Sequence, residues 1–435
     1  MMIDDRTDRY LVIGAGAAGL AAARRLSEAG IAFEVVDGGK QIGGLWAMPP
    51  EDGPLYRNTH LISPKSLQAF ADFPMPAEYP DFPHHSLALR YLQSYAAHHK
   101  LDEKIELGVR VSNISPNGHG WHVALADGTT RKYKGVLIAS GKHSTPSLPK
   151  FEGAFDGEIL HCREYSDPAS LRDKRVLVIG CGQSAIDLVA ESAVVARRTI
   201  HSTRRGLFSM PRYLLGKPFE EHLQGDPPLR ETFARWSTGL LKRLGAAPKQ
   251  LRHAALSFAD GFIHPTVGRE FFRFYEQGDV TLRGPVHELD GRFVTFADGS
   301  REEIDVIYCA TGYRLEYPFI DRALLQWRDG APRPDLFLHT FPDSDSLFVL
   351  GMMQPLGAHW TTYDEQAQLV VDFLRLRERG GPGLEEFRRR RRAERPRLDG
   401  GIDFYARERK GTPDVDKLSF RAQARKLRRR MQRHA

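Results

Sequence analysis

Two stretches of the chain repeat one pattern of apolar and polar positions. The first runs from residue 10 to 37, and the second from residue 175 to 203. Each stretch reads as a short apolar strand, a glycine-containing turn, a helix and a second apolar strand. Strand, helix and strand in that order form a βαβ unit, and two such units imply parallel sheets.

The segments after the two units also resemble each other. Residues 105–139 contain short strand-like runs that lead into a buried strand at 135–139, and residues 279–310 end in a similar strand at 305–310. We therefore expect one domain that is interrupted by another. The predicted boundaries are 1–150 and 301–380 for the interrupted domain, 151–300 for the inserted domain, and 381–435 for a basic helical tail.

The turn of the first unit has the spacing G-x-G-x-x-G. The first glycine permits a tight turn, the second lets the backbone approach a pyrophosphate, and the third lets the helix pack closely on the strand. The helix N-terminus then offers unpaired N–H groups to the phosphates. An acid ends the second strand, where it is expected to hydrogen-bond a ribose. The predicted dinucleotide contacts are Gly14, Gly16, Ala17, Ala18, Gly19 and Asp37.

The second unit differs from the first in its turn and beyond its second strand. Alanine replaces the third glycine, which still allows close packing, and two arginines stand beyond the second strand in place of an acid. Arginine accommodates a 2′-phosphate through planar, bidentate contacts, which predicts NADPH rather than NADH. The alternative is an arginine pair that only faces solvent. The predicted contacts are Gly180, Gly182, Gln183, Ser184, Ala185, Thr203, Arg204 and Arg205.

One turn with an acid and one with arginines indicate two different dinucleotides, for which FAD and NADPH are the natural pair. The predicted fold class is α/β, with two Rossmann-like dinucleotide-binding domains. The NADPH domain is inserted into the FAD domain, and a helical C-terminal tail comes after them. A nicotinamide in the second domain can then deliver hydride to the flavin.

The positive charge of the protein is concentrated in the tail. The net charge is +7 for 435 residues, but residues 381–435 carry +10 and residues 1–380 carry −3. A basic tail can bind nucleic acid or an anionic membrane, whereas the simpler interpretation, which we favour, is a solvated helical tail. Five apolar residues suggest that part of the tail docks on the body of the protein. They are Phe387, Leu398, Phe404, Tyr405 and Phe420.

Three cysteines, far apart in the sequence, exclude several classes of protein. Cys162, Cys181 and Cys309 form no C-x-x-C pair, which argues against a disulfide framework, a cysteine metal cluster and a dithiol reductase. No apolar run is long enough to span a membrane, and the acidic N-terminus does not resemble a signal peptide. We expect a cytoplasmic protein without a metal or a nucleic-acid partner. Whether the protein forms a homodimer is left as an alternative.

Further motifs, in their order along the chain, resemble those of the flavin-containing monooxygenases. Ile42-Gly-Gly-Leu-Trp46 resembles that family's flavin-contacting stretch. Phe155-x-Gly157-x-x-x-His161-x-x-x-Tyr165 resembles its fingerprint, in which we interpret the histidine as structural or linking rather than as a base.

Later motifs extend the resemblance to residues 8–375. Ser202–Gly206 resembles the NADPH-phosphate segment, 309–313 the A-T-G-(Y/F) motif, and 354–357 with 364–366 a late segment near the flavin. The resemblance adds these residues to the predicted cofactor contacts: Gly44, Leu45, Trp46, Ile62, Val111, Gly141, Thr311, Gly312 and Gln354.

The resemblance implies an NADPH- and FAD-dependent monooxygenase. Such an enzyme inserts one atom of O2 into a small molecule through a flavin hydroperoxide. The cofactor performs the chemistry, so the protein binds, orients and excludes water. The fingerprint ends in Tyr165-Ser166, whereas the Baeyer–Villiger branch has Trp followed by Pro or Asp. This difference favours oxygenation of nitrogen or sulfur.

One position departs from the family pattern. Ile62 stands where the family commonly carries an Asn that stabilises the oxygenated flavin, and isoleucine offers no hydrogen bond. Asn58, His60 and Ser63 are the candidates to compensate for it. The departure keeps open a carbon-oxygenating relative, either Baeyer–Villiger or decarboxylating, and an uncoupled NADPH oxidase. A degenerate flavoprotein that acts as a scaffold is a third alternative.

Overall fold

The computed structural model describes residues 3–48, 53–118, 120–204, 209–224, 266–268, 271–355, 357–399 and 414–433. The chain forms two compact units. The first unit contains Met1–Met48, Ser63–Thr145 and Arg314–Ala435, and the second contains Pro49–Ile62 and Pro146–Tyr313. The second unit is thus an insertion in the sequence of the first. The short strands β7 (Thr145–Pro146) and β21 (Tyr313–Arg314) lie where the chain passes between the units.

The first unit is built on a sheet whose strand order is β3-β2-β1-β6-β5-β4, with β22 also pairing with β6. Strands β1, β2, β3, β6 and β22 are parallel neighbours, and β4, β5 and β6 are antiparallel. The strands are β1 (Ile3–Ile13), β2 (Phe33–Asp37), β3 (Ile105–Leu107), β4 (Val111–Asn117), β5 (Gly120–Leu125), β6 (Thr130–Ile138) and β22 (Leu347–Val349).

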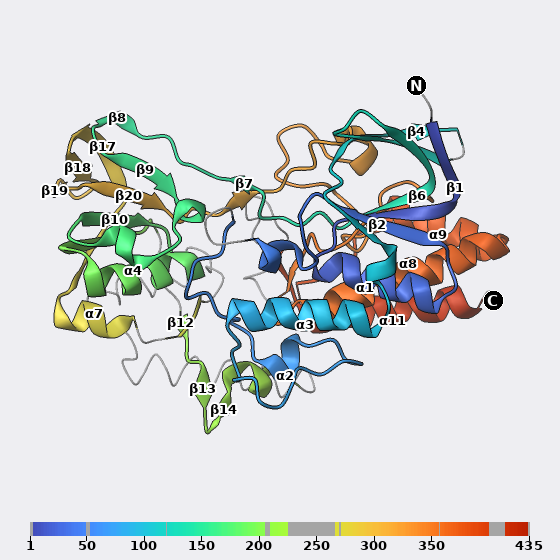
Figure 1. The fold of residues 1–435 in the computed structure, drawn as a ribbon, viewed down its shortest axis with the longest axis horizontal. Helices are drawn as coiled ribbons and strands as arrows, with labels where there is room; N and C mark the ends of the chain where they lie inside the picture. Colours follow the sequence, from blue (N-terminus) through green and yellow to red (C-terminus); the bar gives the residue numbers. More distant parts are fainter. Residues whose placement is uncertain are drawn as a thin grey trace. The chain divides into compact units, whose positions relative to one another are not determined.

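Helices of the first unit cover this sheet, and α1 lies directly against α8 (Figure 1). The Ala-rich sequence of α1 allows this close approach, since its alanines and leucines are almost all buried. The helices are α1 (Ala17–Glu28), α2 (Lys65–Gln68), α3 (His85–His98), α8 (Trp360–Arg379), α9 (Pro382–Ala393) and α11 (Lys417–Arg433). Shorter elements are η1 (Gly44–Ala47), η2 (Asp102–Lys104), η6 (Arg322–Leu325), β23 (Gln354–Pro355) and β24 (Asp414–Val415).

The second unit has a parallel sheet in the order β16-β11-β10-β20-β9, and a smaller sheet in the order β19-β18-β17-β8. Its strands are β8 (Glu152–Phe155), β9 (Glu158–His161), β10 (Arg175–Ile179), β11 (Arg198–Ser202), β16 (Val280–Arg283), β17 (Val286–Gly291), β18 (Phe293–Phe296), β19 (Arg301–Glu303) and β20 (Val306–Cys309). The other elements are α4 (Gln183–Val195), α7 (Phe272–Gln277), η3 (Cys162–Glu164), η4 (Pro168–Leu171), η5 (Phe219–Leu223), β12 (Ser209–Met210), β13 (Tyr213–Leu214), β14 (Lys217–Pro218) and β15 (Thr266–Val267).

Each unit therefore contains a βαβ motif in a parallel sheet, which confirms the predicted α/β class with two Rossmann-like folds. The boundary predicted at residue 300 is wrong, because β20 pairs in parallel with β10 and β9 and so belongs to the second unit. Residues 301–313 are therefore assigned to the second unit as well. Residues 49–62 also fall in the second unit rather than in the first.

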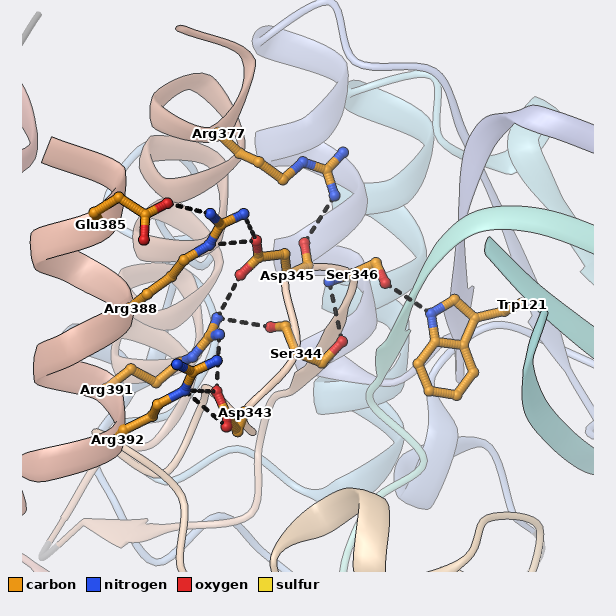
Figure 2. Close-up of polar contacts among 10 residues, drawn as sticks. All are labelled: Trp121, Asp343, Ser344, Asp345, Ser346, Arg377, Glu385, Arg388, Arg391 and Arg392. Atoms are coloured by element: carbon orange, nitrogen blue, oxygen red, sulfur yellow. Dashed lines mark hydrogen bonds and ion pairs between the residues drawn. The ribbon is translucent and has the colours of Figure 1, made fainter. Parts of the chain in front are cut away.

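The basic tail is docked on the first unit rather than fully solvated. Arg391 in α9 is buried, and it donates to Ser344 O at 2.8 Å and to Asp345 Oδ1 at 2.9 Å (Figure 2). Arg388 donates to the same Asp345, and Arg392 pairs with Asp343 at 2.9 Å. The solvated-tail interpretation is wrong for Arg388 and Arg391, which are half-buried and buried against the acidic loop just before β22. Arg392 pairs with the same loop but stays exposed, as that interpretation expects.

The apolar residues of the tail agree with the docking prediction. Phe387, Leu398 and Phe420 are buried, as expected. Phe387 packs against Phe373 of α8 with 4.6 Å between ring centroids. Residues 404 and 405, which were predicted to dock in the same way, lie outside the described part of the chain.

Candidate functional site

The first glycine turn joins β1 to α1. Gly14 has a φ of +111°, and a Cβ there would lie 2.5 Å from the carbonyl oxygen of Ala139. At Gly19 a Cβ would lie 1.8 Å from the carbonyl oxygen of Gly14. Both positions are therefore restricted to glycine by close backbone approach, which is the physical reason for the motif.

Helix α1 begins without a side-chain cap. Gly16 is its N-cap, no side chain bonds the first N–H groups, and no acidic residue lies in the first turn. The N–H groups at a helix start have no intrahelical partner and favour an anion. Ala17 and Ala18 are buried and keep side-chain bulk away from this end. The N-terminus of α1 therefore fits a pyrophosphate.

Asp37 stands beside the same turn, at the end of β2. Its Oδ2 accepts a hydrogen bond from Ala15 N at 2.6 Å, and its Oδ1 accepts one from Gly39 N at 2.7 Å. These two bonds fix the carboxylate next to the glycines, as a ribose-binding acid requires.

The Gly-Gly-Leu-Trp segment packs on the glycine turn. Gly43 N donates to Ala15 O at 3.1 Å, and a Cβ on Gly44 would lie 2.7 Å from Gly16 Cα. The ring of Trp46 meets Trp360 edge to face, with 6.3 Å between centroids. Leu45 is half-buried in the same short helix η1. The structure thus brings together two motifs that lie far apart in the sequence.

Three further predicted contacts lie in other parts of the first unit. Gly141 is exposed after β6 with a φ of +84°, whereas Val111 is buried in the hydrophobic core of the first unit. Gln354 lies in β23, where its Oε1 accepts from Lys142 Nζ at 2.8 Å. Lys142 was not among the predicted site residues, since no local pattern signals a contact with a residue 212 positions away.

The second glycine turn repeats this geometry in the second unit. Gly180 has a φ of +144°, and a Cβ there would lie 2.3 Å from Ala310 O. Gly182 is the N-cap of α4, which has no side-chain cap and no acid in its first turn. A Cβ on Gly182 would meet no atom within 4 Å, and Ala185 is fully buried. The N-terminus of α4 therefore also fits a phosphate group.

Gln183 is occupied by contacts within the second unit. Its carboxamide donates to Val267 O at 3.2 Å and accepts from Val267 N at 2.9 Å. It also donates to Asp187 Oδ1 at 2.9 Å. Burial raises the pKa of Asp187 to about 6, and Tyr56 OH donates to the same carboxylate. Ser184 is half-buried beside Gln183.

A buried histidine, which was not among the predicted site residues, supports the second turn. Burial lowers the pKa of His201 to about 4, so its ring is neutral at neutral pH. Its Nε2 then donates to Gly180 O at 2.6 Å, and Tyr275 OH donates to its Nδ1 at 2.5 Å. Thr203, at the end of the strand, is buried, and Arg204 beyond it is exposed. Arg205 lies outside the described residues.

The fingerprint histidine contacts the A-T-G motif. His161 is fully buried, and its Nε2 donates to Gly312 O at 2.9 Å while its Nδ1 accepts from Arg163 N at 3.1 Å. Thr311 Oγ1 donates to Ser147 O at 2.5 Å, and Ser147 N donates to Gly312 O at 2.9 Å. These contacts agree with a structural role for the histidine.

The compensating candidates are divided between the two units. Asn58 is exposed, and its amide donates to Glu191 Oε1 at 3.1 Å. The Nδ1 of His60 bonds Asn58 O at 2.7 Å, and Ile62 is half-buried. These three residues belong to the second unit, whereas the buried Ser63 begins the next segment of the first.

Comparisons with known proteins agree with this geometry. A family profile described as flavin-binding monooxygenase-like matches residues 7–379. Flavin-containing monooxygenase 5 of Oryctolagus cuniculus is 31% identical over 402 residues, which cover 83% of this chain and 72% of that protein.

Two solved structures share the fold. Flavin-containing monooxygenase from Stenotrophomonas maltophilia has a TM-score of 0.64 at 21% identity, covering 85% of this chain and 98% of that one. An oxidized steroid monooxygenase bound to NADP has a TM-score of 0.70 at 18% identity, covering 98% of both chains.

The chain therefore belongs to the flavin-binding monooxygenase-like family. It is an NADPH-dependent flavin monooxygenase, and its cofactors are FAD and NADPH. In the part of the chain that is described, no helix combines the length and the apolar character that crossing a membrane would require.

Proposed function

We propose that the first glycine turn binds FAD and the second binds NADPH. The uncapped start of α1, the carboxylate of Asp37 and the packed Gly44 support FAD at the first turn. The uncapped start of α4 and the exposed Arg204 support NADPH at the second. Bound FAD supplies the oxidising chemistry, and NADPH supplies the hydride.

The proposed reaction is transfer of one oxygen atom from O2 to a nitrogen or sulfur atom of a small molecule. The observation that carries this choice is the end of the fingerprint, where Tyr165-Ser166 replaces the Trp and Pro or Asp of the Baeyer–Villiger branch. Tyr165 is buried and donates to Glu191, so the ring that marks this branch is held in the core of the second unit. The protein's own task is to bind, orient and exclude water.

The cellular surroundings that we propose for the enzyme rest on its cysteines. Cys162, Cys181 and Cys309 are not joined by disulfides, and burial raises the pKa of Cys162 and of Cys309 to about 12. Buried thiols of this kind suit a reducing compartment, and a cytoplasmic location is part of the proposal. The partners are then O2 and a small-molecule substrate.

The test is a coupled assay of the purified enzyme with FAD, NADPH and a panel of small amines, sulfides and ketones. We expect an amine or a sulfide to give oxygenated product in proportion to the NADPH consumed. Product from ketones alone would contradict the proposal, and so would NADPH consumption that yields only hydrogen peroxide with every compound.

A second candidate function, an NADPH oxidase, is favoured by Ile62. The family's hydrogen-bonding Asn is replaced there by a half-buried isoleucine, and the amide of the candidate Asn58 already donates to Glu191. Ile62→Asn is expected to raise the fraction of NADPH that ends in product rather than peroxide by about tenfold, the value of one hydrogen bond to a polar intermediate. Ile62→Leu, which changes the shape of the side chain without adding a hydrogen-bonding group, serves as the control. Equal coupling in all variants would argue against a role for this position.

A further inference from the structure

The segment after residue 379 is outside the family match, yet it is built into the first unit. The family profile ends at residue 379, whereas α9, β24 and α11 lie beyond it. Figure 1 shows α9 and α11 beside α8. The family match therefore says nothing about this segment, and its role is inferred from its contacts.

The tail supplies a strand to the segment that contains Gln354. Strand β24 pairs in parallel with β23, with Gln354 opposite Asp414 and Pro355 opposite Val415. Among the described strands, β24 is the one that pairs with β23. Val415 is fully buried. A two-residue strand has little stability alone, so its position depends on this pairing.

Helix α11 fastens this strand to α8. Asp416 comes directly after β24 and caps α11, since its Oδ2 accepts from Ser419 N and Oγ at 2.8 Å each. Arg428 then pairs with Asp372 at 2.6 Å, and Arg421 pairs with Glu365. The apolar side of the helix is buried through Phe420, Ala424, Leu427 and Met431.

Glu365 lies between Asp364, which contacts the last turn of α1, and Gln366, which contacts the loop beside the first turn of α1. Asp364 pairs with Arg25 of α1, its Oδ1 accepting from Arg25 Nε at 2.7 Å. Gln366 Oε1 accepts from Gly351 N at 3.1 Å, and a Cβ on Gly351 would lie 2.9 Å from the Cβ of Ala18. The tail therefore contacts the same stretch of α8 that holds α1 and the loop before β23.

The other side of Gln354 is held by Lys142. Lys142 is nine-tenths buried, and its ammonium group donates to Gln354 Oε1 at 2.8 Å and to Met353 O at 3.0 Å. A buried ammonium group is costly unless acceptors surround it, so these bonds fix the position of the side chain. Gln354 is thus held by a lysine on one side and by the backbone of the tail on the other.

We propose that the C-terminal segment is a positioning element of the flavin site, which acts through β24 on Gln354 and Pro355. It keeps this strand ordered before FAD arrives, so FAD does not have to order it on binding. The affinity for FAD then depends on a segment that the family profile does not cover. The inference rests on the proposed contact between Gln354 and FAD.

The test measures the dissociation constant of FAD by the quenching of flavin fluorescence in the full-length apoprotein. Val415→Ala removes buried contacts of β24 and is expected to weaken FAD binding about tenfold. Val415→Ile, which keeps a β-branched side chain, is expected to leave the dissociation constant of FAD close to the wild-type value. The dissociation constant of NADP⁺ is expected to stay unchanged, which shows that the second unit is folded.

Two controls separate positioning from loss of stability. Phe387→Ala removes a buried ring of α9 without touching β24, and Arg425→Ala changes an exposed residue of α11. We expect neither to change the FAD dissociation constant at a temperature well below unfolding. Equal weakening by Val415→Ala and Phe387→Ala would overturn the proposal, because it would mean that only the stability of the tail matters. If Val415→Ala does not fold, Val415→Thr replaces it with the same expectation in direction.

Gln354→Ala separates this inference from the assignment on which it rests. If Gln354→Ala weakens FAD binding and Val415→Ala does not, the role of the tail is wrong and the flavin contact survives. If Gln354→Ala binds FAD as tightly as the wild type, the contact itself is wrong and the proposal falls with it.

Discussion

At the end of β11, buried residues that anchor the strand are followed directly by an exposed arginine. His201 and Ser202 are buried, and Ser202 Oγ donates to Gly284 O at 2.8 Å. Thr203 N donates to Arg283 O at 3.2 Å, which holds the strand end in place. Arg204 is the first exposed side chain after them. This residue therefore has the freedom to meet a ligand, while its predecessors set its position.

Arg204→Ala is expected to raise the KM for NADPH about tenfold or more, since hydrogen bonds to charged groups contribute about 1.5–3 kcal/mol. The KM for NADH is expected to stay the same, because NADH lacks the 2′-phosphate. Initial-rate measurements with both nucleotides check this. Arg197→Ala is the matched control, since Arg197 is exposed just before the opposite end of β11. An unchanged preference for NADPH in Arg204→Ala would refute the assignment.

Helix α9 shows how an element with a high charge density becomes part of a fold. Its sequence has five consecutive arginines at 388–392, a run that usually indicates a solvated surface. The helical period instead turns Arg388, Arg391 and Arg392 toward Asp343 and Asp345 (Figure 2). The loop that carries these acids is also tied to β5, since Trp121 Nε1 donates to Ser346 Oγ at 2.9 Å.

Arg391→Met is expected to lower the free energy of unfolding by about 2 kcal/mol, because it removes the charge-assisted hydrogen bonds that the buried Arg391 donates to the half-buried Asp345 and to Ser344. Arg389→Met, two residues away on the exposed side of the helix, is expected to change it by less than about 0.5 kcal/mol. Urea unfolding of the two variants provides the comparison. Similar losses in both would mean that the contacts of Arg391 do not stabilise the fold.

The two units repeat one architecture along a single chain. Each has a glycine with a positive φ after the first strand of its βαβ motif, a glycine N-cap and an uncapped helix start. Their residues differ where a ligand would be distinguished, with Asp37 in the first unit and Arg204 in the second. We therefore expect two similar phosphate sites, one for each of the two dinucleotides.

Hydrogen exchange of the whole protein is expected to separate the two ligands. FAD added to the apoprotein should slow exchange at the start of α1 and in η1, whereas NADP⁺ should slow it at the start of α4. At a ligand concentration about 100 times the dissociation constant, the gain in stability is about 2.7 kcal/mol, which is measurable in this experiment. Protection of the same peptides by both ligands would contradict the assignment of one site to each.

The sequence was sufficient for features that depend on neighbouring residues. The strand–turn–helix order of each unit, the glycine turns and the place of Asp37 at the end of β2 follow from local periodicity and from backbone geometry that only glycine allows. Their order along the chain was also enough for the family resemblance, which the family match confirms. The burial of the tail residues at 387, 398 and 420 could be predicted from their apolar character.

The tertiary structure alone decided which distant segments meet. The last strand of the second unit, β20, could not be assigned from its apolar sequence, since it would suit either sheet equally well, and pairing with β10 places it. Several contacts join residues that are separated in sequence. They are the hydrogen bond from Arg391 to Asp345, the one from His201 to Gly180, the one from Lys142 to Gln354, and the pairing of β24 with β23. A sequence pattern shows which face of a helix or strand is apolar. A buried charge or amide, in contrast, is stabilised by specific partners that only the folded chain brings together.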